Sequence, residues 1–273
     1  APFLARLRYV VLDELHAYRG VFGTHVALIL RRLLRLARHY GASPQVLAAS
    51  ATIANAREHA EALTGLPFEE LKAQVARTER ELLVLLPKPL DRRGERRRSP
   101  LLEAAYLARR LAEAGLKGLV FAGARKSAEL IARYAAHPLV RPYRAGYTAR
   151  ERRRLEADLK EGRVRVLVST SALELGVDIG ELDAVVLVGY PGSTAAFWQR
   201  AGRAGRGERR ALLVYIPRED PMDEYFLHRP ALLLESPPEE AVADPQNPVL
   251  CPLHLHAAAR EKPLLAEELL CPE

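Results

Sequence analysis

Two hydrophobic patterns alternate along the chain. Short, almost unbroken aliphatic runs, such as residues 164–168 and 184–188, are typical of parallel strands that helices cover on both faces. Other stretches, such as residues 24–39, place apolar residues at helical spacing. The alternation of strand and helix patterns predicts an α/β fold built on parallel sheets.

Similar patterns mark the other elements that the sequence predicts. The run at 8–12 is expected to be a buried strand. Further strands are expected at 45–49, 82–86, 118–122, 140–144 and 210–216. Helices are expected at 54–63, 100–114 and 125–135, after the capping residues Thr148 and Ser193, and with weaker periodicity at 221–234 and 253–270.

Arginines are concentrated in two of these regions. The predicted helix at 24–39 interleaves its apolar positions with Arg31, Arg32, Arg35 and Arg38. We expect these arginines to form a solvated face rather than a nucleic-acid contact. The charge run at 91–98 is likewise expected to be an exposed, solvated loop, and the alternative is a basic loop that touches a phosphate backbone.

The amino-acid composition bears on the number of domains and on the charge of a binding partner. The 273 residues are 49% hydrophobic, which is enough for packed cores in two ordinary domains. The net charge of +7, from 41 basic and 34 acidic residues, fits a polyanionic partner. Arginine-rich composition also follows from genome base composition or heat adaptation, so the charge is weak support for such a partner.

Cysteine content and hydropathy bear on the location of the protein. Two cysteines are too few for a disulfide framework, and the sequence shows no signal-peptide pattern and no apolar run of about 18 residues. We therefore expect a cytoplasmic protein without membrane partners. The chain begins at Ala1 without an initiator methionine and enters a predicted strand within a few residues, so it is expected to be a fragment.

The loops that follow the strands at 164–168 and 184–188 form the first candidate site. Loops after the carboxyl ends of parallel strands line the binding crevice of an open α/β sheet. Arg203 and Arg206 share a face if the helix after Ser193 continues. Two guanidinium groups suit a polyphosphate, because arginine stabilises charge on a transferred phosphoryl group. The alternative is a solvated basic helix end.

A second candidate site follows the strand at 8–12. Asp13 and Glu14 are adjacent carboxylates at its carboxyl end, and either one also suits a helix cap. The functional interpretation is that Asp13 holds Mg²⁺ through water, while Glu14 orients or deprotonates the water that attacks a γ-phosphate. The strand at 45–49 ends in Ser-Ala-Thr at residues 50–52, a tripeptide that carries little information alone.

In this order the motifs resemble those of superfamily 2 helicases. The matching segments are Asp-Glu-x-His at 13–16 for the second motif, 50–52 for the third, 118–127 for the fourth, and 164–206 for the fifth and sixth. Residues 17–25 and 55–65 look like segments of the bacterial MrfA/YprA-type DNA repair helicases. The resemblance spans nearly the whole chain and is sparse between Phe68 and Ser99.

The resemblance implies a role for each matching residue. The residues that it assigns to catalysis are Asp13, Glu14, His16, Gln199, Arg203 and Arg206, and Asp13 is also the implied water-mediated Mg²⁺ ligand. The residues that it assigns to ATP binding are Asp178, Arg203 and Arg206. The residues that it assigns to nucleic-acid binding are Ser50, Thr52, Arg125, Thr170 and Gly176.

The implied fold is a pair of tandem RecA-like parallel-sheet domains, the first truncated at its N-terminal side, followed by a short, mostly helical C-terminal extension. We expect these parts at 1–80, 81–218 and 219–273, the last leading to a missing winged-helix region. A zinc site is a less favoured alternative for this extension, because the spacing of its candidate ligands fits no common pattern. The candidates are Cys251, His254, His256 and Cys271.

The phosphate-binding loop of the family is missing from the sequence. No Gly-x4-Gly-Lys-Ser/Thr segment occurs, and residues 118–127 do not supply one, because Ala124 and Arg125 separate Gly123 from Lys126. That loop contributes a backbone cradle and a lysine to ATP binding. Without it, the segment is expected to be catalytically inert alone.

The parent protein is therefore expected to be an ATP-dependent DNA helicase that uses ATP and Mg²⁺, acts on single-stranded or forked DNA, and serves DNA repair. The alternatives are an RNA-directed DExH helicase, a non-catalytic RecA-like nucleic-acid-binding module, and a phosphate-handling α/β enzyme unrelated to helicases. His16 and Gln199 favour the DNA-type branch, because the RNA-dependent DEAD class usually has aspartate and histidine at these places.

Overall fold

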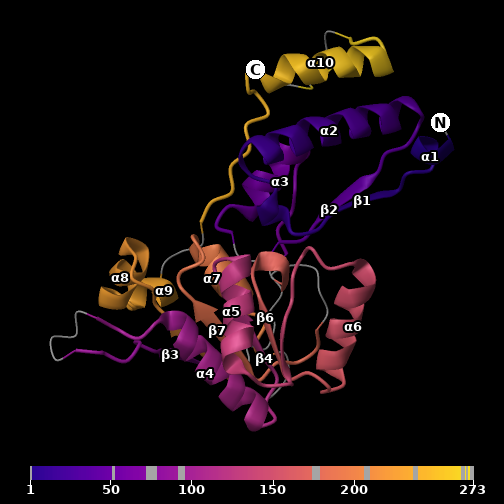
Figure 1. Cartoon of the computed structure of the whole chain (residues 1–273). Helices are drawn as coiled ribbons and strands as arrows, with labels where there is room; N and C mark the ends of the chain where they lie inside the picture. The colour runs from indigo at the N-terminus through magenta and orange to yellow at the C-terminus, as the bar shows by residue number, and fades with distance from the viewer. Residues whose placement is uncertain are drawn as a thin grey trace. The chain divides into compact units, whose positions relative to one another are not determined.

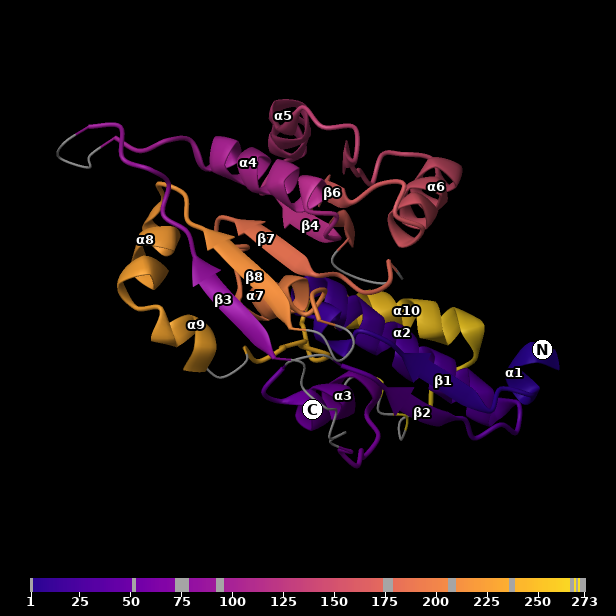
Figure 2. The same ribbon diagram turned by 90° about the horizontal axis from the view of Figure 1, so that it is seen from below.

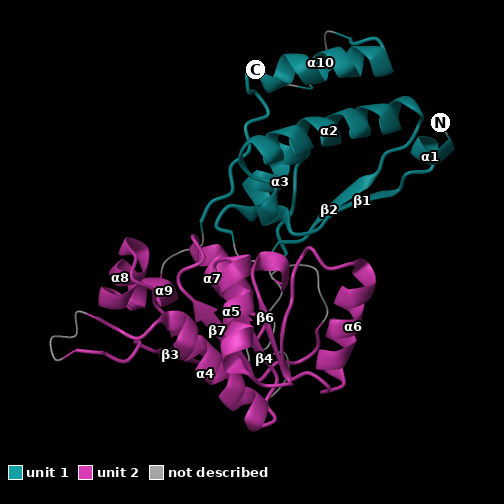
Figure 3. Ribbon diagram, viewed as in Figure 1, with its two compact units in different colours: residues 1–74, 237–273 teal, residues 75–236 magenta. Residues whose placement is uncertain are grey.

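The computed structural model describes residues 2–50, 53–71, 79–91, 96–173, 179–205, 210–235, 239–265, 268 and 270. It divides into two compact units, which Figure 3 colours separately. Unit 1 comprises Ala1–Gln74 and Pro237–Glu273, and unit 2 comprises Val75–Ser236. The segment expected as an extension at 219–273 thus contributes its first part to unit 2 and its last part to unit 1.

Unit 1 contains two parallel strands and the helices that pack on them. Its elements are α1 (Pro2–Ala5), β1 (Tyr9–Leu12), η1 (Leu15–Ala17), α2 (Gly20–His39), β2 (Gln45–Ala48), α3 (Ala56–Thr64) and α10 (Leu250–Glu261). In the parallel pair, Tyr9 lies opposite Gln45 and Leu12 lies opposite Ala48. Figure 1 shows α10 lying along α2.

The expectation of a buried strand at 8–12 is wrong for one face of β1. Val10 and Leu12 belong to the core of unit 1, with side chains of α2 and α3. Tyr9 and Val11 are 59% and 65% exposed. Because successive strand residues point to opposite faces, only one face of this sheet is covered within the part of the chain that the structure describes.

Arg35 of α2 is a buried attachment point for the C-terminal segment. It is 7% exposed, and its Nε donates to the Glu268 carboxylate at 2.7 Å. Its two Nη atoms donate to the carbonyl oxygens of Ala258, Lys262 and Pro263. One guanidinium therefore satisfies acceptors from the end of α10 and from the residues that follow it.

The other arginines of α2 divide between buried contacts and solvent. Arg32 pairs with Glu261 of α10, and Nη2 of Arg31 donates to the carbonyl oxygen of Ala62 at 2.9 Å. Arg38 is exposed. The expected solvated face is therefore wrong for Arg31, Arg32 and Arg35, which hold the C-terminal segment and α3, and it describes Arg38 alone.

Three side chains form a hydrogen-bonded chain between α2 and α10. Nη1 of Arg32 lies 3.2 Å from Nδ1 of His254, and Nε2 of His254 lies 2.9 Å from Nδ1 of His25. Because a guanidinium only donates, His254 accepts at Nδ1 and donates from Nε2 to His25. His254 is therefore neutral in this arrangement. Burial lowers the pKa of His254, and the positive charge of Arg32 acts in the same direction.

Unit 2 is built on a six-stranded sheet in the order β3-β8-β7-β4-β6-β5, with neighbouring strands parallel. Its elements are β3 (Arg80–Val84), α4 (Pro100–Glu113), β4 (Gly118–Phe121), α5 (Arg125–Ala135), β5 (Val140–Pro142), α6 (Ala149–Lys160), β6 (Val166–Ser169), η2 (Ser171–Leu173), β7 (Ala184–Val188), α7 (Thr194–Ala201), β8 (Ala211–Ile216), α8 (Pro221–His228) and α9 (Ala231–Glu235).

Both faces of the unit 2 sheet are covered. On one face, Val120 and Val186 pack with side chains of α4 and α5, which lie over the same side of the sheet in Figure 2. On the other face, Leu119, Phe121 and Leu187 pack with side chains of α6, α7, α8 and α9. Burial on both faces is the reason that these strands appear in the sequence as nearly unbroken aliphatic runs.

The helix boundaries in unit 2 follow the capping signals. Thr148 accepts the N–H of Glu151 at 3.2 Å, and the Glu151 carboxylate accepts the N–H of Thr148 at 2.8 Å, which completes the predicted capping box. Ser193 accepts the N–H of Ala196 at 3.0 Å. In unit 1, α10 forms the first part of the helical segment expected at 253–270, and residues 266, 267 and 269 lie outside the described residues. None of the described helices has both the length and the apolar character that crossing a bilayer requires.

Candidate functional site

The loop after β1 presents two carboxylates on a strained backbone. Asp13 is exposed, and its Oδ1 accepts the N–H of Glu14 at 2.9 Å. Glu14 has φ 52° and ψ 49°, in the left-handed region, which costs a residue with a side chain about 1–2 kcal/mol. The Glu14 side chain makes no capping bond to η1. Helix capping therefore does not explain the pair, and the strain points to a functional turn.

Backbone hydrogen bonds tie this loop to the end of β2. The N–H of Leu15 donates to the carbonyl of Ala49 at 2.9 Å, and the N–H of Ala49 donates to the carbonyl of Leu12 at 2.8 Å. Ser50 comes next, and its buried Oγ has no hydrogen-bond partner among the described residues. The Asp-Glu-x-His loop and Ser50 therefore lie side by side, whereas Thr52 lies outside the described residues.

Two histidines are buried at this loop. His16 is 8% exposed, and its Nδ1 lies 3.6 Å from Oε2 of Glu14. His59 of α3 is 1% exposed. Burial lowers the pKa of His59, while the carbonyl oxygens of Tyr18 and Leu15 oppose the shift without meeting hydrogen-bond geometry. The sequence pattern did not identify His59 as a residue that packs at this loop, because His59 occupies a position on the apolar face of α3.

The carboxyl end of the unit 2 sheet carries two of the predicted nucleic-acid contacts. Arg125 is exposed at the start of α5, shortly after β4 ends. Thr170 is half-buried and directly follows β6. Since β4 and β6 are parallel neighbours in which Phe121 lies opposite Ser169, Arg125 and Thr170 lie at the same edge of the sheet. Gly176 lies outside the described residues.

The arginine segment after α7 does not continue the helix. α7 ends at Ala201 with Gly202 as its C-cap, and the N–H of Arg203 donates to the carbonyl of Arg200 in the turn that follows, at 3.1 Å. Arg203 is 8% exposed, so a solvated helix end is the wrong interpretation of this residue. Arg206 lies outside the described residues, as does Asp178 among the predicted ATP contacts.

Contacts on both sides hold this turn in place. The guanidinium of Arg200 lies 5.4 Å from the ring centre of Phe121, at the end of β4. Gly205 adopts φ 76°, and its N–H donates to the carbonyl of Leu182 at 3.2 Å. Gln199 is half-buried on α7. The turn therefore presents Arg203 from a fixed backbone, which suits recognition of a charged ligand.

A buried acid holds the loop that leads from β7 into α7. Asp223 of α8 is fully buried, accepts the N–H of Tyr190 at 2.8 Å, and also accepts the hydroxyl of Tyr215. Nε of Arg218 lies 3.5 Å from its other oxygen. Burial raises the pKa of Asp223 and that of Tyr215. No sequence signal marked Asp223, because its partners come from separate loops and strands.

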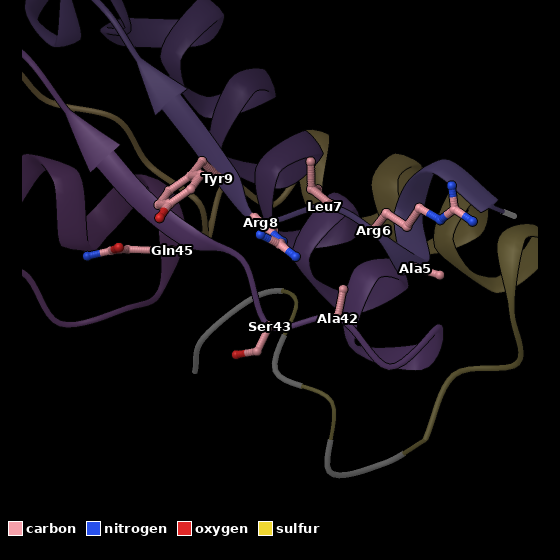
Figure 4. Close-up of a pocket in the computed structure, with 8 residues that line it drawn as sticks. All are labelled: Ala5, Arg6, Leu7, Arg8, Tyr9, Ala42, Ser43 and Gln45. Atoms are coloured by element: carbon pink, nitrogen blue, oxygen red, sulfur yellow. The ribbon is translucent and has the colours of Figure 1, made fainter.

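A pocket of about 740 Å³ lies at the other end of the unit 1 strands, as Figure 4 shows. Arg6, Arg8, Tyr9 and Gln45 are among its lining residues, and the lining contains no carboxylate. The pocket lies at the amino ends of β1 and β2, whereas Asp13 follows the carboxyl end of β1. It is therefore separate from the carboxylate loop.

The histidines considered for zinc have other contacts. His254 is bound between Arg32 and His25, and Nδ1 of His256 lies 2.9 Å from the carbonyl of Pro252. Among the residues that the structure describes, no three His, Cys, Asp or Glu side chains are grouped to hold a metal ion. Cys271 lies outside them. The zinc alternative gains no support.

An Asp-Glu-x-His turn follows a strand of the parallel sheet in unit 1, and a fixed arginine turn follows α7 in the parallel α/β unit 2. Together these features define a class of RecA-like, nucleotide-dependent proteins that act on nucleic acid. Two family models agree with this class. The model described as DEAD/DEAH box helicase matches residues 1–60, and the helicase conserved C-terminal domain matches residues 101–208. The chain therefore carries a DEAD/DEAH box helicase segment and a helicase conserved C-terminal domain, as its motifs predicted.

Two curated relatives indicate which helicases the chain is similar to. The chain is 41% identical to the uncharacterized ATP-dependent helicase YprA of Bacillus subtilis (strain 168), over 96% of this chain and 36% of that protein. It is 35% identical to the ATP-dependent helicase hrq1 of Schizosaccharomyces pombe, over 96% of this chain and 26% of that protein. It therefore spans about a third of the length of the curated relatives that it matches.

A solved structure confirms the predicted fold class. The crystal structure of DUF1998 helicase MrfA bound to DNA and AMPPNP matches with a TM-score of 0.89 and 39% identity. The match covers 98% of this chain and 38% of that chain. The parallel-sheet α/β fold predicted from the alternating patterns and the RecA-like architecture implied by the resemblance are therefore correct.

Proposed function

We propose that the chain is part of an ATP-dependent DNA helicase that moves along single strands and unwinds duplex DNA. The observation that carries the proposal is the carboxylate pair of Asp13 and Glu14, held in a strained turn beside the end of β2. The similarity to YprA supports ATP dependence, and the similarity to MrfA with DNA and AMPPNP supports both a nucleotide and DNA as ligands.

Asp13 is the residue that we propose to hold Mg²⁺ through water. Mg²⁺ prefers oxygen ligands, keeps several waters, and takes one or two protein carboxylates together with substrate phosphates. The Asp13 side chain fits this role, because it is an exposed carboxylate and the N–H of Glu14 fixes one of its oxygens. When bound, ATP with Mg²⁺ supplies the γ-phosphoryl group and a cation that neutralises its charge.

Glu14 is the proposed general base. Its carboxylate is half-buried, and Nδ1 of His16 lies 3.6 Å from Oε2, which restrains the carboxylate from one side. A restrained carboxylate is able to orient a water and to take its proton during attack on phosphorus. Arg203 is proposed to stabilise the charge that develops on the transferred group, together with Arg206 and with Gln199 in a supporting place.

DNA binding is assigned to groups that recognise a backbone rather than bases. Arg125 offers an exposed guanidinium and Thr170 a hydroxyl, both at the carboxyl edge of the unit 2 sheet. Such phosphate contacts position a strand without reading its sequence. Ser50, whose buried hydroxyl has no hydrogen-bond partner among the described residues, is proposed to couple DNA binding to the carboxylate loop. A role in DNA repair and a cytoplasmic location stay predictions.

The test uses the full-length protein, because this chain spans 36% of YprA. ATP hydrolysis is measured without nucleic acid, with single-stranded DNA and with single-stranded RNA, and strand separation is measured on a forked duplex. We expect DNA to stimulate hydrolysis more than RNA, and the fork to separate only with ATP. If neither nucleic acid stimulates hydrolysis, the helicase proposal is wrong. If RNA alone does, the RNA-directed alternative replaces it.

A further inference from the structure

A basic arm connects β3 to α4 in unit 2. Its described parts are residues 85–91 and 96–98, and these two segments pair antiparallel at Pro89 and Arg97. The N–H of Leu90 donates to the carbonyl of Arg96 at 2.7 Å, and the N–H of Arg98 donates to the carbonyl of Lys88 at 2.8 Å. Figures 1 and 2 show the arm projecting from the side of unit 2 next to β3. In the charge run at 91–98, residues 96–98 therefore pair with residues 88–90, and residues 92–95 lie outside the described part of the chain.

The register between the two paired segments of the arm determines which side chains share a face. Pro89 lies opposite Arg97, so Lys88 lies opposite Arg98 and Leu90 lies opposite Arg96. Paired residues point to the same face, and the face alternates along each strand. The face that we call the arm face carries Lys88, Leu90, Arg96 and Arg98. Three of its four side chains are cations.

The cations of the arm face have few carboxylate partners. Lys88 and Arg96 are exposed, and no carboxylate of the described residues lies within 4.0 Å of either charge. Asp91 accepts the backbone N–H of Arg96 at 3.0 Å rather than its guanidinium. Nε of Arg98 lies 3.6 Å from Glu103. Among the described residues, Lys88 and Arg96 therefore have no carboxylate partner, whereas Arg98 has one.

Other exposed arginines of unit 2 do have a carboxylate partner. On α4, Nε of Arg109 lies 2.8 Å from the Glu113 carboxylate, and Nη1 of Arg110 lies 2.9 Å from it. These two arginines therefore share one carboxylate of their own helix. They are exposed like those of the arm, so they provide a matched control for the effect of charge alone.

The arm is also held in shape before any ligand arrives. Pro87 and Pro89 have fixed φ angles, and Pro87 is buried at the base of the arm. Nη1 of Arg97, on the opposite face, donates to the carbonyl of Pro87 at 3.1 Å. Because these contacts restrict the backbone in the free protein, little ordering entropy is lost when the arm face binds a partner.

We propose that the arm face is a second DNA contact, in which Lys88 and Arg96 bind backbone phosphates. Leu90, which is 65% exposed between them on the same face, lies against sugar or base. The proposal rests on the proposed function, since it names a further surface for the same DNA. A cation pair next to an apolar side chain fits a nucleic-acid backbone, whose phosphates alternate with apolar sugar surface.

The experiment measures DNA binding by the full-length protein with fluorescence anisotropy, on a labelled single strand and on a labelled fork, over a range of salt concentrations. The test variant combines Lys88→Ala with Arg96→Ala, and the control combines Arg109→Ala with Arg110→Ala. Each phosphate contact adds about 0.7–0.9 to the slope of log affinity against log salt. The arm variant should therefore lose about 1.4–1.8 from that slope on at least one substrate.

Three outcomes separate the two proposals. A shallower slope in the arm variant, with an unchanged slope in the control and in the charge-preserving pair Lys88→Arg and Arg96→Lys, supports the arm contact. Equal slopes in wild type, arm variant and control overturn it and leave the helicase proposal standing. If the wild type shows no salt-dependent DNA binding, the proposed function itself is wrong. Circular dichroism melting confirms that the variants fold.

Discussion

Replacing Arg35 by alanine is predicted to detach the C-terminal segment from α2. The side chain is 7% exposed and donates to the Glu268 carboxylate and to three carbonyl oxygens. Alanine removes the guanidinium from all four acceptors, although the Glu268 carboxylate keeps other donors, Nζ of Lys262 at 3.3 Å and the N–H of Leu265 at 3.2 Å. The acceptors belong to the end of α10 and the residues after it, so the effect should appear there first rather than in the strands of unit 1.

The free-energy cost of Arg35→Ala follows from the burial of Arg35 and Glu268. Breaking a buried ion pair by removing one partner costs about 3–5 kcal/mol. Glu268 is 21% exposed at its side chain, so water replaces part of the lost interaction and the lower end of this range applies. A cost of about 3 kcal/mol increases the population of the detached segment by about 10²-fold, at 1.4 kcal/mol for each factor of ten.

Hydrogen exchange followed by mass spectrometry measures this opening directly. Peptides that cover α10 should exchange about 10²-fold faster in Arg35→Ala. Arg38→Ala is the matched control, because Arg38 lies on the same helix and is exposed, and its exchange should equal that of the wild type. Arg35→Lys should be intermediate, since lysine keeps the charge without the planar fork. Equal exchange in Arg35→Ala and Arg38→Ala would refute the clamp.

Three further predictions concern stability. The pKa of His254 is lowered below 6.5 in the folded chain. The stability that comes from neutral His254 is therefore complete above pH 6.5 and is lost as the pH falls below 6.5. Below pH 6.5, the melting temperature should fall more steeply with decreasing pH in wild type than in His254→Gln. Asp223→Ala should cost about 3–5 kcal/mol in urea unfolding, against about 0.5 or less for the exposed neighbour Glu224→Ala. Thr148→Ala should cost about 1 kcal/mol by the same assay, and Arg150→Ala, in the same helix, should cost about 0.5 or less.

Local patterns were enough to predict most of unit 2. The aliphatic run at 184–188 became β7, buried along its whole length, and the Thr148 capping box formed as expected. Both features depend on residues that are close in sequence or on burial from both sides. A strand covered on both faces leaves a clear sequence signal, because every position has to be apolar.

The same patterns failed where the partner lies far away in sequence. Arg35 looks like a polar position of an amphipathic helix, and its acceptor Glu268 is 233 residues away. Periodicity shows that polar positions share a face, but not whether solvent or another segment covers it. The run at 8–12 likewise shows that β1 is apolar, but not that Tyr9 and Val11 are exposed.

Part of the candidate site was predicted from the sequence, and part was not. Asp13, Glu14 and Ser50 meet because motifs at the ends of parallel neighbours β1 and β2 converge. The supporting residue His59 escaped prediction, since a histidine on an apolar helix face has no distinctive spacing. The condition that the helix after Ser193 continues to Arg206 was also left open by periodicity, because the turn after α7 depends on a contact between Gly205 and Leu182.

The central claim is that the carboxylate loop after β1 hydrolyses a nucleotide. The most direct measurement is ATP turnover by the full-length protein with saturating single-stranded DNA, compared between wild type and Glu14→Gln. Loss of a general base lowers the rate by about 10²–10⁴-fold, and DNA binding with AMPPNP should be unchanged. Turnover that stays within about twofold of wild type would contradict the claim.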